Sequence, residues 1–451
     1  MADGSRRRVV ILGAGGRDFH NFNTVYRDDP GVEVLAFGAA QIPGIADRRY
    51  PPSLAGPLYP DGIPILDQAG LPAFCREQGV EEVVFAYSDV SHEEVMHTAS
   101  AFLAVGCDFA MLGPGATMLR SARPVIAVTA VRTGCGKSPV SRHITGLLAS
   151  RGVAVGVLRH PMPYGDLARQ EVQRFATVGD LDAAQCTVEE REEYQPYVTA
   201  GQVVFAGVDY QRILAAAEAE CDVILWDGGN NDFPFLRPDL LIVLADALRP
   251  GHETAYHPGE TLLRMADHVL IMKVADAAED DVRAIESTAA AANPGAGVIH
   301  GDLEVSLDRP DAVEGKRVLV IEDGPTITHG GRPTGAGYAG ARAAGAEEIV
   351  DPRPHAVSEI AETYAHFPHI GPVLPALGYY PEQLAALAET IARVPADVVV
   401  AATPANLENL LEIDKPLVRA SYAYVERDTP GLAGIVTAFC DRLDEGRGGT
   451  R

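Results

Sequence analysis

A glycine loop set between a strand and a helix constrains the fold of this chain more than any other feature. Residues 124–130 form an apolar run typical of a buried strand, and residues 139–151 have the pattern of a helix. The loop between them ends in the sequence Gly-Cys-Gly-Lys-Ser at positions 134–138. A phosphate-binding loop requires this order of strand, loop and helix. The sequence therefore predicts an α/β fold with a nucleotide site at this loop.

The residues of this loop have distinct expected roles. Glycines let backbone N–H groups turn toward phosphate oxygens, Lys137 would reach the β- and γ-phosphates, and Ser138 would bind Mg²⁺. The loop departs from GxxxxGK[ST] at Val131, and Arg132 stands where dimerising ATPases carry a signature lysine. A chance Gly-Cys-Gly turn before Lys-Ser is the alternative. The expected nucleotide-binding residues are Thr133, Gly134, Cys135, Gly136, Lys137, Ser138 and Pro139.

A second apolar strand, residues 223–226, leads into Asp227 and is the expected partner of this loop. A carboxylate at the end of such a strand holds Mg²⁺ directly or through water. The alternative is an ordinary strand-to-turn junction, where Asp-Gly is common. We therefore expect Ser138 and Asp227 as metal ligands.

Residues 270–276 stand where G proteins carry the base-reading sequence Asn-Lys-x-Asp. Met272 replaces the asparagine, and Asp276 falls one place late. The carboxylate that would read guanine is therefore missing or displaced, so we expect ATP rather than GTP. Lys273 would cover a base with its stem or serve as an ordinary surface lysine.

Short apolar runs alternate with helical stretches along the whole chain, which is the rhythm of a parallel α/β protein. The glycines and proline at 113–115 mark a boundary. We expect a Rossmann-like parallel sheet in residues 1–122 and a P-loop NTPase sheet of the dimerising-ATPase or G-protein type in residues 123–300. Residues 301–451 are expected to be a C-terminal α/β extension, either a separate domain or a continuation of the P-loop sheet.

Composition excludes several classes of protein. The chain of 451 residues has 62 acidic and 37 basic side chains and a net charge of −25, which argues against binding nucleic acid or an anionic membrane. No apolar run reaches the roughly 18 residues of a membrane span. The six cysteines are scattered without a CxxC pair, which indicates a reducing compartment and no structural zinc site. We expect a cytoplasmic protein.

A first glycine loop follows the first expected strand, at residues 13–16. A dinucleotide fingerprint would require glycine at position 18, where the chain has Asp18. Binding of NAD is therefore a weak hypothesis. Beside a helix N-terminus, Arg17, His20 and Asn21 would suit a small phosphorylated or carboxylated ligand. The alternative is a tight turn with an internally satisfied histidine.

Other polar groups follow expected strands, where ligands of α/β proteins bind. Arg159 ends a strand, and Arg249 and His252 lie in a polar loop after another. Thr328 and His329 belong to a hydroxyl- and glycine-rich loop. The alternatives are a cap at Arg159 and solvated loops elsewhere.

Four of these segments together resemble the cyclic 2,3-diphosphoglycerate synthetase family. They are residues 15–23, 132–138, 246–253 and 322–331. The resemblance implies an ATP- and Mg²⁺-dependent closure of 2,3-diphosphoglycerate into a cyclic phosphoanhydride, with release of ADP and phosphate. The two phosphates and the carboxylate carry roughly four to five negative charges, so cations would have to surround them.

Within this resemblance each residue has an implied place. Lys137, Ser138 and Asp227 would hold ATP and Mg²⁺. Arg132 would neutralise the charge of the transferred group, across the interface of a homodimer. The implied catalytic residues are therefore Lys137, Arg132 and Asp227. The small anionic substrate would contact Arg17, His20, Asn21, Arg159, Arg249, His252, Thr328 and His329. The alternatives are a P-loop kinase or ligase for another small polyanionic metabolite, and a GTPase-like regulatory switch.

Overall fold

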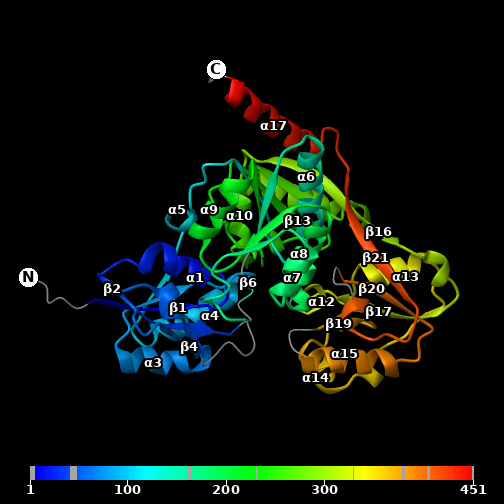
Figure 1. Cartoon of the computed structure of the whole chain (residues 1–451), viewed down its shortest axis with the longest axis horizontal. Helices are drawn as coiled ribbons and strands as arrows, with labels where there is room; N and C mark the ends of the chain where they lie inside the picture. The colour runs from blue at the N-terminus through cyan, green and yellow to red at the C-terminus, as the bar shows by residue number, and fades with distance from the viewer. Residues whose placement is uncertain are drawn as a thin grey trace, which may run out of the picture.

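The computed structural model describes residues 6–40, 48–159, 162, 165–229, 232–328, 330–377, 381–403 and 407–448. It has three lobes, which follow one another from blue through green to orange along the chain (Figure 1). Mixed, mostly parallel sheets form the lobes, with helices packed on them, so the predicted α/β class is confirmed.

The N-terminal lobe contains a six-stranded sheet with the order β3-β4-β2-β1-β5-β7. All its strand pairs are parallel except β3 with β4. Residues 63–67 pair with β2 as a strand, and the helix that follows them begins at Leu71. The strands are β1 (Arg7–Leu12), β2 (Val32–Ala39), β3 (Arg49–Tyr50), β4 (Ile63–Asp67), β5 (Glu82–Phe85), β6 (Val90–Ser91) and β7 (Asp108–Met111).

Helices α1 to α5 belong to this lobe and its exit. Ser91 caps α4 by accepting the N–H of Glu94, a standard helix start. Their bounds are α1 (Arg17–Asn21), the π-helix η1 (Phe22–Tyr26), α2 (Pro52–Ala55), η2 (Gln68–Gly70), α3 (Leu71–Gln78), α4 (His92–Leu103) and α5 (Pro114–Thr117).

The other two lobes share one sheet of 13 strands. Its order is β10-β11-β9-β12-β8-β13-β15-β16-β21-β20-β17-β18, with β19 paired to β17. The strands are β8 (Val125–Ala130), β9 (Val155–Arg159), β10 (Gln173–Phe175), β11 (Val203–Ala206), β12 (Val223–Asp227), β13 (Leu240–Asp246), β15 (His268–Met272), β16 (Gly297–Leu307), β17 (Arg317–Asp323), β18 (Glu348–Ile349), β19 (Leu374–Ala376), β20 (Val398–Ala402) and β21 (Leu417–Glu426).

Strand β16 joins the central and C-terminal lobes. Its first half pairs in parallel with β15, and its second half pairs antiparallel with β21. The expected boundary at residue 300 therefore falls inside a strand, and residues 301–451 continue the P-loop sheet. The long arrows of β16 and β21 run side by side from one lobe to the other (Figure 1).

Helices cover the shared sheet on both lobes. Thr177 and Thr187 begin α7 and α8 with capping boxes. The helices are α6 (Lys137–Ser150), α7 (Val178–Ala183), α8 (Val188–Thr199), α9 (Tyr210–Glu220), η3 (His252–Thr254), α10 (Gly259–Met265), η4 (Val274–Asp276), α11 (Glu279–Ala292), η5 (Pro310–Ala312), α12 (Gly324–Ile327), α13 (Ala336–Ala343), η6 (Arg353–His355), α14 (Ser358–His366), α15 (Pro381–Arg393), α16 (Leu407–Leu410) and α17 (Leu432–Gly448).

The N-terminal lobe is attached to the central lobe by backbone pairing as well as by side chains. β6 forms a two-stranded antiparallel sheet with β14 (Tyr256–His257), which follows the polar loop after β13. Leu119 bridges to Leu236 in the central lobe. These contacts hold the N-terminal lobe against the central lobe.

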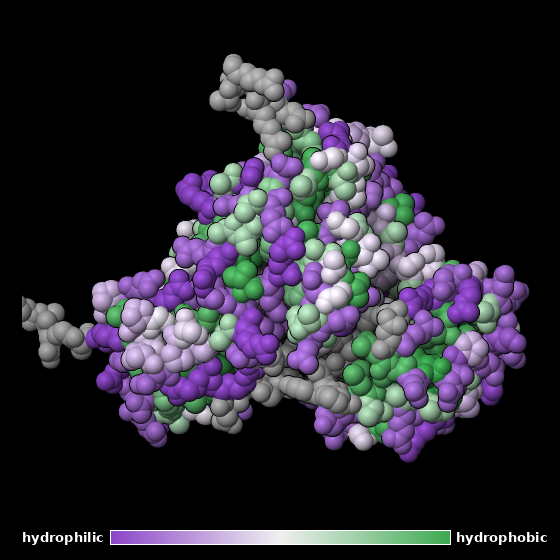
Figure 2. Space-filling model, viewed as in Figure 1, coloured by the Kyte–Doolittle hydropathy of each residue, from purple (hydrophilic) through white to green (hydrophobic). Residues whose placement is uncertain are grey.

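The viewed surface is mostly hydrophilic, and hydrophobic residues gather on the C-terminal lobe, on the side toward the centre of the molecule (Figure 2). Within the described ranges, the structure contains no helix with both the length and the apolar character needed to cross a membrane.

Candidate functional site

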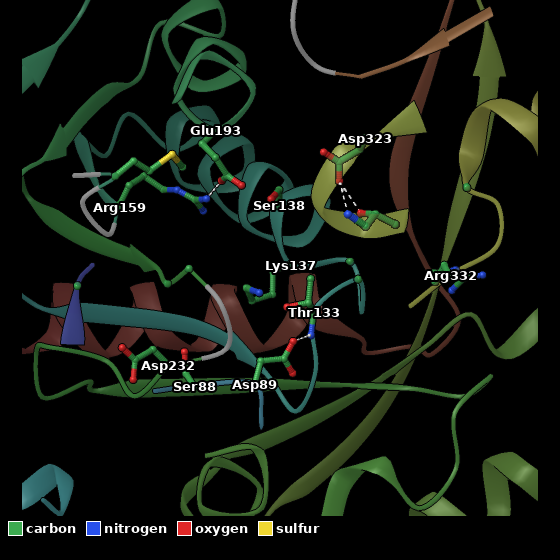
Figure 3. Close-up of a pocket in the computed structure, with 18 of the residues that line it drawn as sticks. Ser88, Asp89, Thr133, Lys137, Ser138, Arg159, Glu193, Asp232, Asp323 and Arg332 are labelled. Atoms are coloured by element: carbon green, nitrogen blue, oxygen red, sulfur yellow. Dashed lines mark hydrogen bonds and ion pairs between the residues drawn. The ribbon is translucent and has the colours of Figure 1, made fainter. Parts of the chain in front are cut away.

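A cavity of about 670 Å³ lies where the three lobes meet (Figure 3). The glycine loop that ends in Lys137 and Ser138, called the P-loop here, forms its centre. The ends of β1 and β5 contribute residues from the N-terminal lobe. The C-terminal lobe contributes the end of β17 and the start of α13. This position fits the rule that ligands of open α/β sheets bind beyond the C-terminal ends of the strands.

The P-loop connects β8 to α6, as the sequence predicts. Gly134 and Gly136 have φ of +80° and +106°, a conformation that favours glycine. Lys137, Ser138 and Pro139 begin α6 and line the cavity, so the positive end of this helix faces the cavity. Burial lowers the pKa of Lys137, and nearby Asp227 opposes that shift.

Asp227 ends β12, beside the P-loop strand β8, and is fully buried. Its Oδ2 accepts a hydrogen bond from the Tyr197 hydroxyl at 2.5 Å and forms an ion pair with Arg159. Its Oδ1 has no hydrogen-bond partner among the described residues. An unsatisfied carboxylate oxygen on the strand beside β8 is a hard oxygen ligand of the kind that Mg²⁺ prefers.

The described side chains do not by themselves form a complete metal site. In the part of the chain that the structure describes, no group of three or more His, Cys, Asp or Glu side chains could hold a metal ion. A P-loop site does not need one, because the nucleotide phosphates supply the remaining oxygen ligands.

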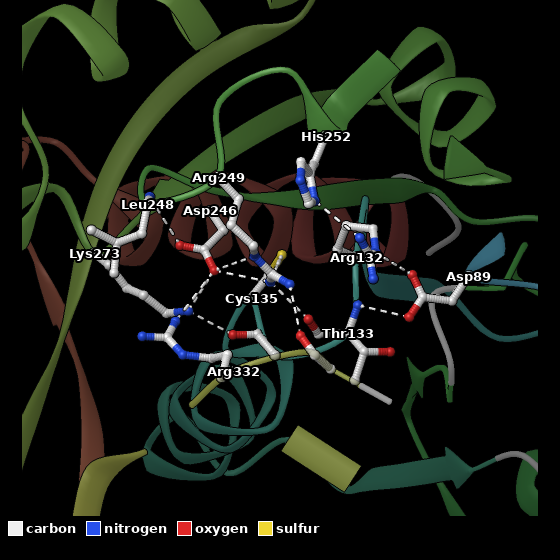
Figure 4. Close-up of polar contacts among 12 residues, drawn as sticks. Asp89, Arg132, Thr133, Cys135, Asp246, Leu248, Arg249, His252, Lys273 and Arg332 are labelled. Atoms are coloured by element: carbon white, nitrogen blue, oxygen red, sulfur yellow. Dashed lines mark hydrogen bonds and ion pairs between the residues drawn. The ribbon is translucent and has the colours of Figure 1, made fainter. Parts of the chain in front are cut away.

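Asp246, at the end of β13, is surrounded by three cations (Figure 4). Its Oδ2 accepts Lys273 Nζ at 2.7 Å and Arg249 Nε at 3.0 Å. Lys273 also donates to the Gly134 carbonyl, and Arg249 donates to the Thr133 carbonyl at 2.7 Å. Arg249, expected to contact the substrate, therefore holds the backbone of the P-loop.

Arg132 connects the P-loop to the N-terminal lobe. Its Nε donates to Asp89 Oδ1 at 2.7 Å, and its Nη1 donates to His252 Nδ1 at 2.9 Å. The guanidinium lies over the Tyr256 ring, 3.6 Å from its centroid. Asp89 Oδ2 also lies 3.4 Å from the Thr133 amide nitrogen. The structure thus gives Arg132 and His252 partners within the chain, although we expected them to contact the transferred group and the substrate.

The first glycine loop is filled by its own carboxylate. Asp18 accepts the backbone N–H groups of Gly15, Gly16 and Phe19. A Cβ added to Gly13 would lie 2.5 Å from Asp18 Oδ2. Burial raises the pKa of Asp18 to about 6, against these hydrogen bonds. The donors that would bind a dinucleotide phosphate are therefore engaged.

The polar residues after this loop contact the central lobe. Arg17 forms a 2.9 Å ion pair with Asp232, and His20 Nε2 bonds the Thr117 carbonyl at 2.7 Å. The His20 ring stacks on Phe235 at 4.1 Å, and burial lowers the pKa of His20 to about 3. Asn21 is buried as well. In this structure Arg17 and His20, expected to bind a substrate, help to dock the two lobes.

The C-terminal lobe presents Glu322 and Asp323 to the cavity. Glu322 accepts N–H groups at the start of α13, and burial raises its pKa to about 7. Thr328 donates to the Gly324 carbonyl at 2.8 Å and is buried, so it stabilises α12. His329 lies outside the described residues.

Sequence reasoning missed several cavity residues. Asp89 follows β5, and the signal that could have found it is its place at a strand end. Glu193 forms an ion pair with Arg159 from α8, a helix without a recognisable motif. Arg332 directly follows the glycine-rich loop after β17 and lines the cavity.

The cavity wall carries more acidic than basic side chains. Among the described residues it has eight carboxylates and five basic groups. Four of the basic groups, Arg17, Arg159, Lys273 and Arg332, form ion pairs with carboxylates. The carboxylates of the wall are Asp18, Asp89, Glu94, Glu193, Asp232, Asp276, Glu322 and Asp323, and the fifth basic residue is Lys137.

Comparison with known proteins gives one relative of high similarity. The chain is 54% identical over 446 residues to the arginine synthetase ArcE of Thermococcus kodakarensis, an alignment that covers 98% of this chain and 100% of the relative. No family model matches. The relative supports the expectation of a synthetase-type enzyme, and it does not support the ring closure of 2,3-diphosphoglycerate.

Solved structures resemble the chain only distantly. LpxK from Aquifex aeolicus is 15% identical to this chain, with a TM-score of 0.39. The alignment covers 71% of this chain and 90% of LpxK. The UDP-N-acetylmuramate:L-alanyl-gamma-D-glutamyl-meso-diaminopimelate ligase from Neisseria meningitides is 11% identical, covers 66% and 81%, and has a TM-score of 0.28. At these TM-scores, neither solved structure indicates the function of this chain.

Proposed function

The chain belongs to the family of the arginine synthetase ArcE, and on this premise we propose that it is an ATP-dependent synthetase that forms arginine. A synthetase drives bond formation by cleaving a nucleoside triphosphate. Arginine differs from its ureido counterpart, citrulline, by one nitrogen in place of one oxygen. The proposed reaction therefore replaces the ureido oxygen with the nitrogen of ammonia.

The proposed chemistry has two steps that balance. The ureido oxygen attacks the γ-phosphorus of ATP, which forms an O–P bond and releases ADP. Ammonia then attacks the ureido carbon, the C–O bond breaks, and phosphate leaves with the electron pair while the nitrogen loses a proton. Oxygen is a poor leaving group until it is phosphorylated, which is why the reaction requires ATP.

The chain's own residues supply binding and charge for these steps. Lys137 and the P-loop amides bind the phosphates and stabilise negative charge as it moves to the leaving ADP. Arg159, which is 2% exposed, lines the same cavity and forms ion pairs with Asp227 and Glu193. Asp227 and Ser138 would hold Mg²⁺, which neutralises phosphate charge when bound.

The observation that carries the proposal is the acidic wall around the P-loop. Carboxylates such as Asp276 and Asp323 suit an acceptor with an ammonium group and a product with a guanidinium group. An acceptor with four or five negative charges would have to bind beside the phosphates of ATP, in a cavity that has more carboxylates than basic groups and where several of the basic groups already form ion pairs. The charge of the wall therefore favours a zwitterionic amino acid over 2,3-diphosphoglycerate.

Purified protein incubated with Mg-ATP, ammonium and citrulline tests the proposal. We expect arginine and ADP in equal amounts, with no product when any component is omitted. In a parallel reaction, 2,3-diphosphoglycerate replaces citrulline and ammonium. Formation of the cyclic phosphoanhydride without arginine would contradict the proposal.

A further inference from the structure

Positive charge exceeds negative charge in the cluster beside the P-loop. Asp246 is buried, and its Oδ2 faces Lys273, Arg249 and Arg332 (Figure 4). Three unit positive charges against one carboxylate leave a formal surplus of two. Such a surplus in a partly desolvated place attracts an anion.

The three cations of this cluster are held very differently. Lys273 and Arg249 each donate to Asp246 and to a P-loop carbonyl, at distances of 2.6 to 3.0 Å. Arg332 Nη1 lies 3.5 Å from an Asp246 oxygen that both of the others already contact. Within the described residues, no hydrogen bond donated by the Arg332 guanidinium is found. This planar group therefore has donors to offer to a ligand.

Arg332 also lies in the right place to meet a nucleotide. It lines the cavity, and its side chain is 26% exposed, against 9% for Lys273. A Cβ added to Gly134 would lie 3.8 Å from Arg332 Cδ and 4.0 Å from Thr326 Cγ2. Two side chains of the C-terminal lobe thus border the space beside a glycine of the P-loop, and Figure 3 shows Arg332 among the elements of the C-terminal lobe.

We propose that Arg332 is a phosphate-binding residue through which the C-terminal lobe contacts the nucleotide held by the P-loop. The inference rests on the proposed use of ATP at this loop. A guanidinium presents parallel N–H groups that match phosphate oxygens, and its charge is constant at working pH. The loosely paired cation would exchange its contact with Asp246 for the phosphates, while Lys273 and Arg249 keep the P-loop in place.

Calorimetric titration with a non-hydrolysable ATP analogue and Mg²⁺ tests this proposal without the acceptor. In Arg332→Gln we expect the dissociation constant to rise by about 10- to 100-fold, the range for losing a hydrogen bond to a charged group. Arg353→Gln is the matched control, because Arg353 lies on the surface of the same lobe and pairs with Asp351. It should bind the analogue as the wild type does. A folded Arg332→Gln variant with a dissociation constant within twofold of wild type would overturn the proposal.

Arg332→Lys keeps the test decisive if the glutamine variant does not fold. Lysine retains the charge but not the planar fork, so we expect weaker binding than wild type by about 3- to 10-fold. Binding equal to wild type would again overturn the inference. The two proposals fail separately: arginine synthesis with unchanged nucleotide binding in the variants removes only the role of Arg332. Weakened nucleotide binding in a protein that makes no arginine removes only the proposed acceptor.

Discussion

The two glycine loops of this chain have similar surroundings but different contents. Both follow a buried strand of a parallel sheet and lead into a helix. In the N-terminal loop, Asp18 accepts the amide protons of Gly15 and Gly16. In the P-loop, Lys137 and Ser138 follow the last glycine, and the loop lies at the centre of the cavity.

The difference teaches that a glycine loop is a set of donors whose ligand depends on the next few residues. A carboxylate within the same turn accepts the hydrogen bonds of these donors and supplies the negative charge that a bound anion would otherwise bring. A lysine and a hydroxyl in that place add positive charge and a metal ligand. The first loop lines the same cavity with its donors engaged and joins the docking surface through Arg17, whereas the second presents a lysine and a hydroxyl to the cavity.

Lys137→Ala gives the largest expected effect, since it removes the charge that distinguishes the P-loop. We expect ATP-dependent turnover to fall by about 10²- to 10³-fold, as when a single group that stabilises a transition state is lost. Lys316→Ala, at an exposed position in the C-terminal lobe, serves as the lysine control. A steady-state assay of ADP release measures the turnover of both variants. Comparable rates in the two variants would contradict the role of Lys137 that distinguishes the P-loop from the first loop.

Ser138→Ala removes the hydroxyl expected to bind Mg²⁺ and leaves the lysine in place. We expect the Mg²⁺ concentration required for half-maximal turnover to rise by about 10- to 100-fold. Ser150→Ala changes the last residue of the same helix, where the hydroxyl only donates to Leu147. A magnesium titration of each variant gives the answer, and an unchanged requirement in Ser138→Ala would exclude this hydroxyl as a ligand.

Asp18→Ala empties the first loop of its carboxylate. We expect a loss of about 1 to 3 kcal/mol in the free energy of unfolding, because buried amides lose their acceptor. The freed amides should then bind phosphate, so inorganic phosphate should stabilise this variant more than it stabilises wild type. Thermal unfolding with and without phosphate measures both effects.

The exposed Asp28→Ala is the control for that experiment. If phosphate stabilises Asp18→Ala no more than it stabilises Asp28→Ala, the emptied loop is not an anion site, and the comparison of the two loops fails.

A smaller effect follows from the pKa of Asp18, raised by burial from 3.8 to about 6. Between these values the folded protein keeps a proton that the unfolded chain releases, so this contribution to stability is complete below pH 3.8 and is lost as pH rises through 6. As pH rises through this window, the free energy of unfolding of wild type should fall relative to that of Asp18→Asn by at most about 1.4 kcal/mol per pH unit. Denaturant unfolding at several pH values measures the unfolding free energy of wild type minus that of Asp18→Asn. A difference that stays constant or rises with pH would contradict the raised pKa of Asp18.

Most of the strands that position the site could be predicted from apolar runs, because β8, β12 and β13 are buried on both faces. Strand β16 was not predicted. Its buried and exposed positions are mixed, and it exchanges a parallel partner for an antiparallel one along its length. Pairing of this kind depends on segments far apart in the sequence.

The P-loop residues could be predicted because their chemistry is local: Lys137 and Ser138 function beside their own glycines. The contacts of Arg17, Arg249 and His252 could not, because a charged residue at a strand end binds either a ligand or another part of the chain. The structure gives each a partner within the chain, Asp232, Asp246 and Arg132 in turn. Arg332 carries no motif, and only the closeness of the lobes places it near Gly134.

The fate of the ureido oxygen tests the central claim most directly. Citrulline labelled with ¹⁸O at the ureido position is incubated with the protein, Mg-ATP and ammonium, and the released phosphate is analysed by mass spectrometry. The proposed phosphorylation of that oxygen predicts one ¹⁸O atom in each phosphate released with arginine. Unlabelled phosphate, or no arginine at all, would contradict the assignment of this P-loop cavity to arginine synthesis.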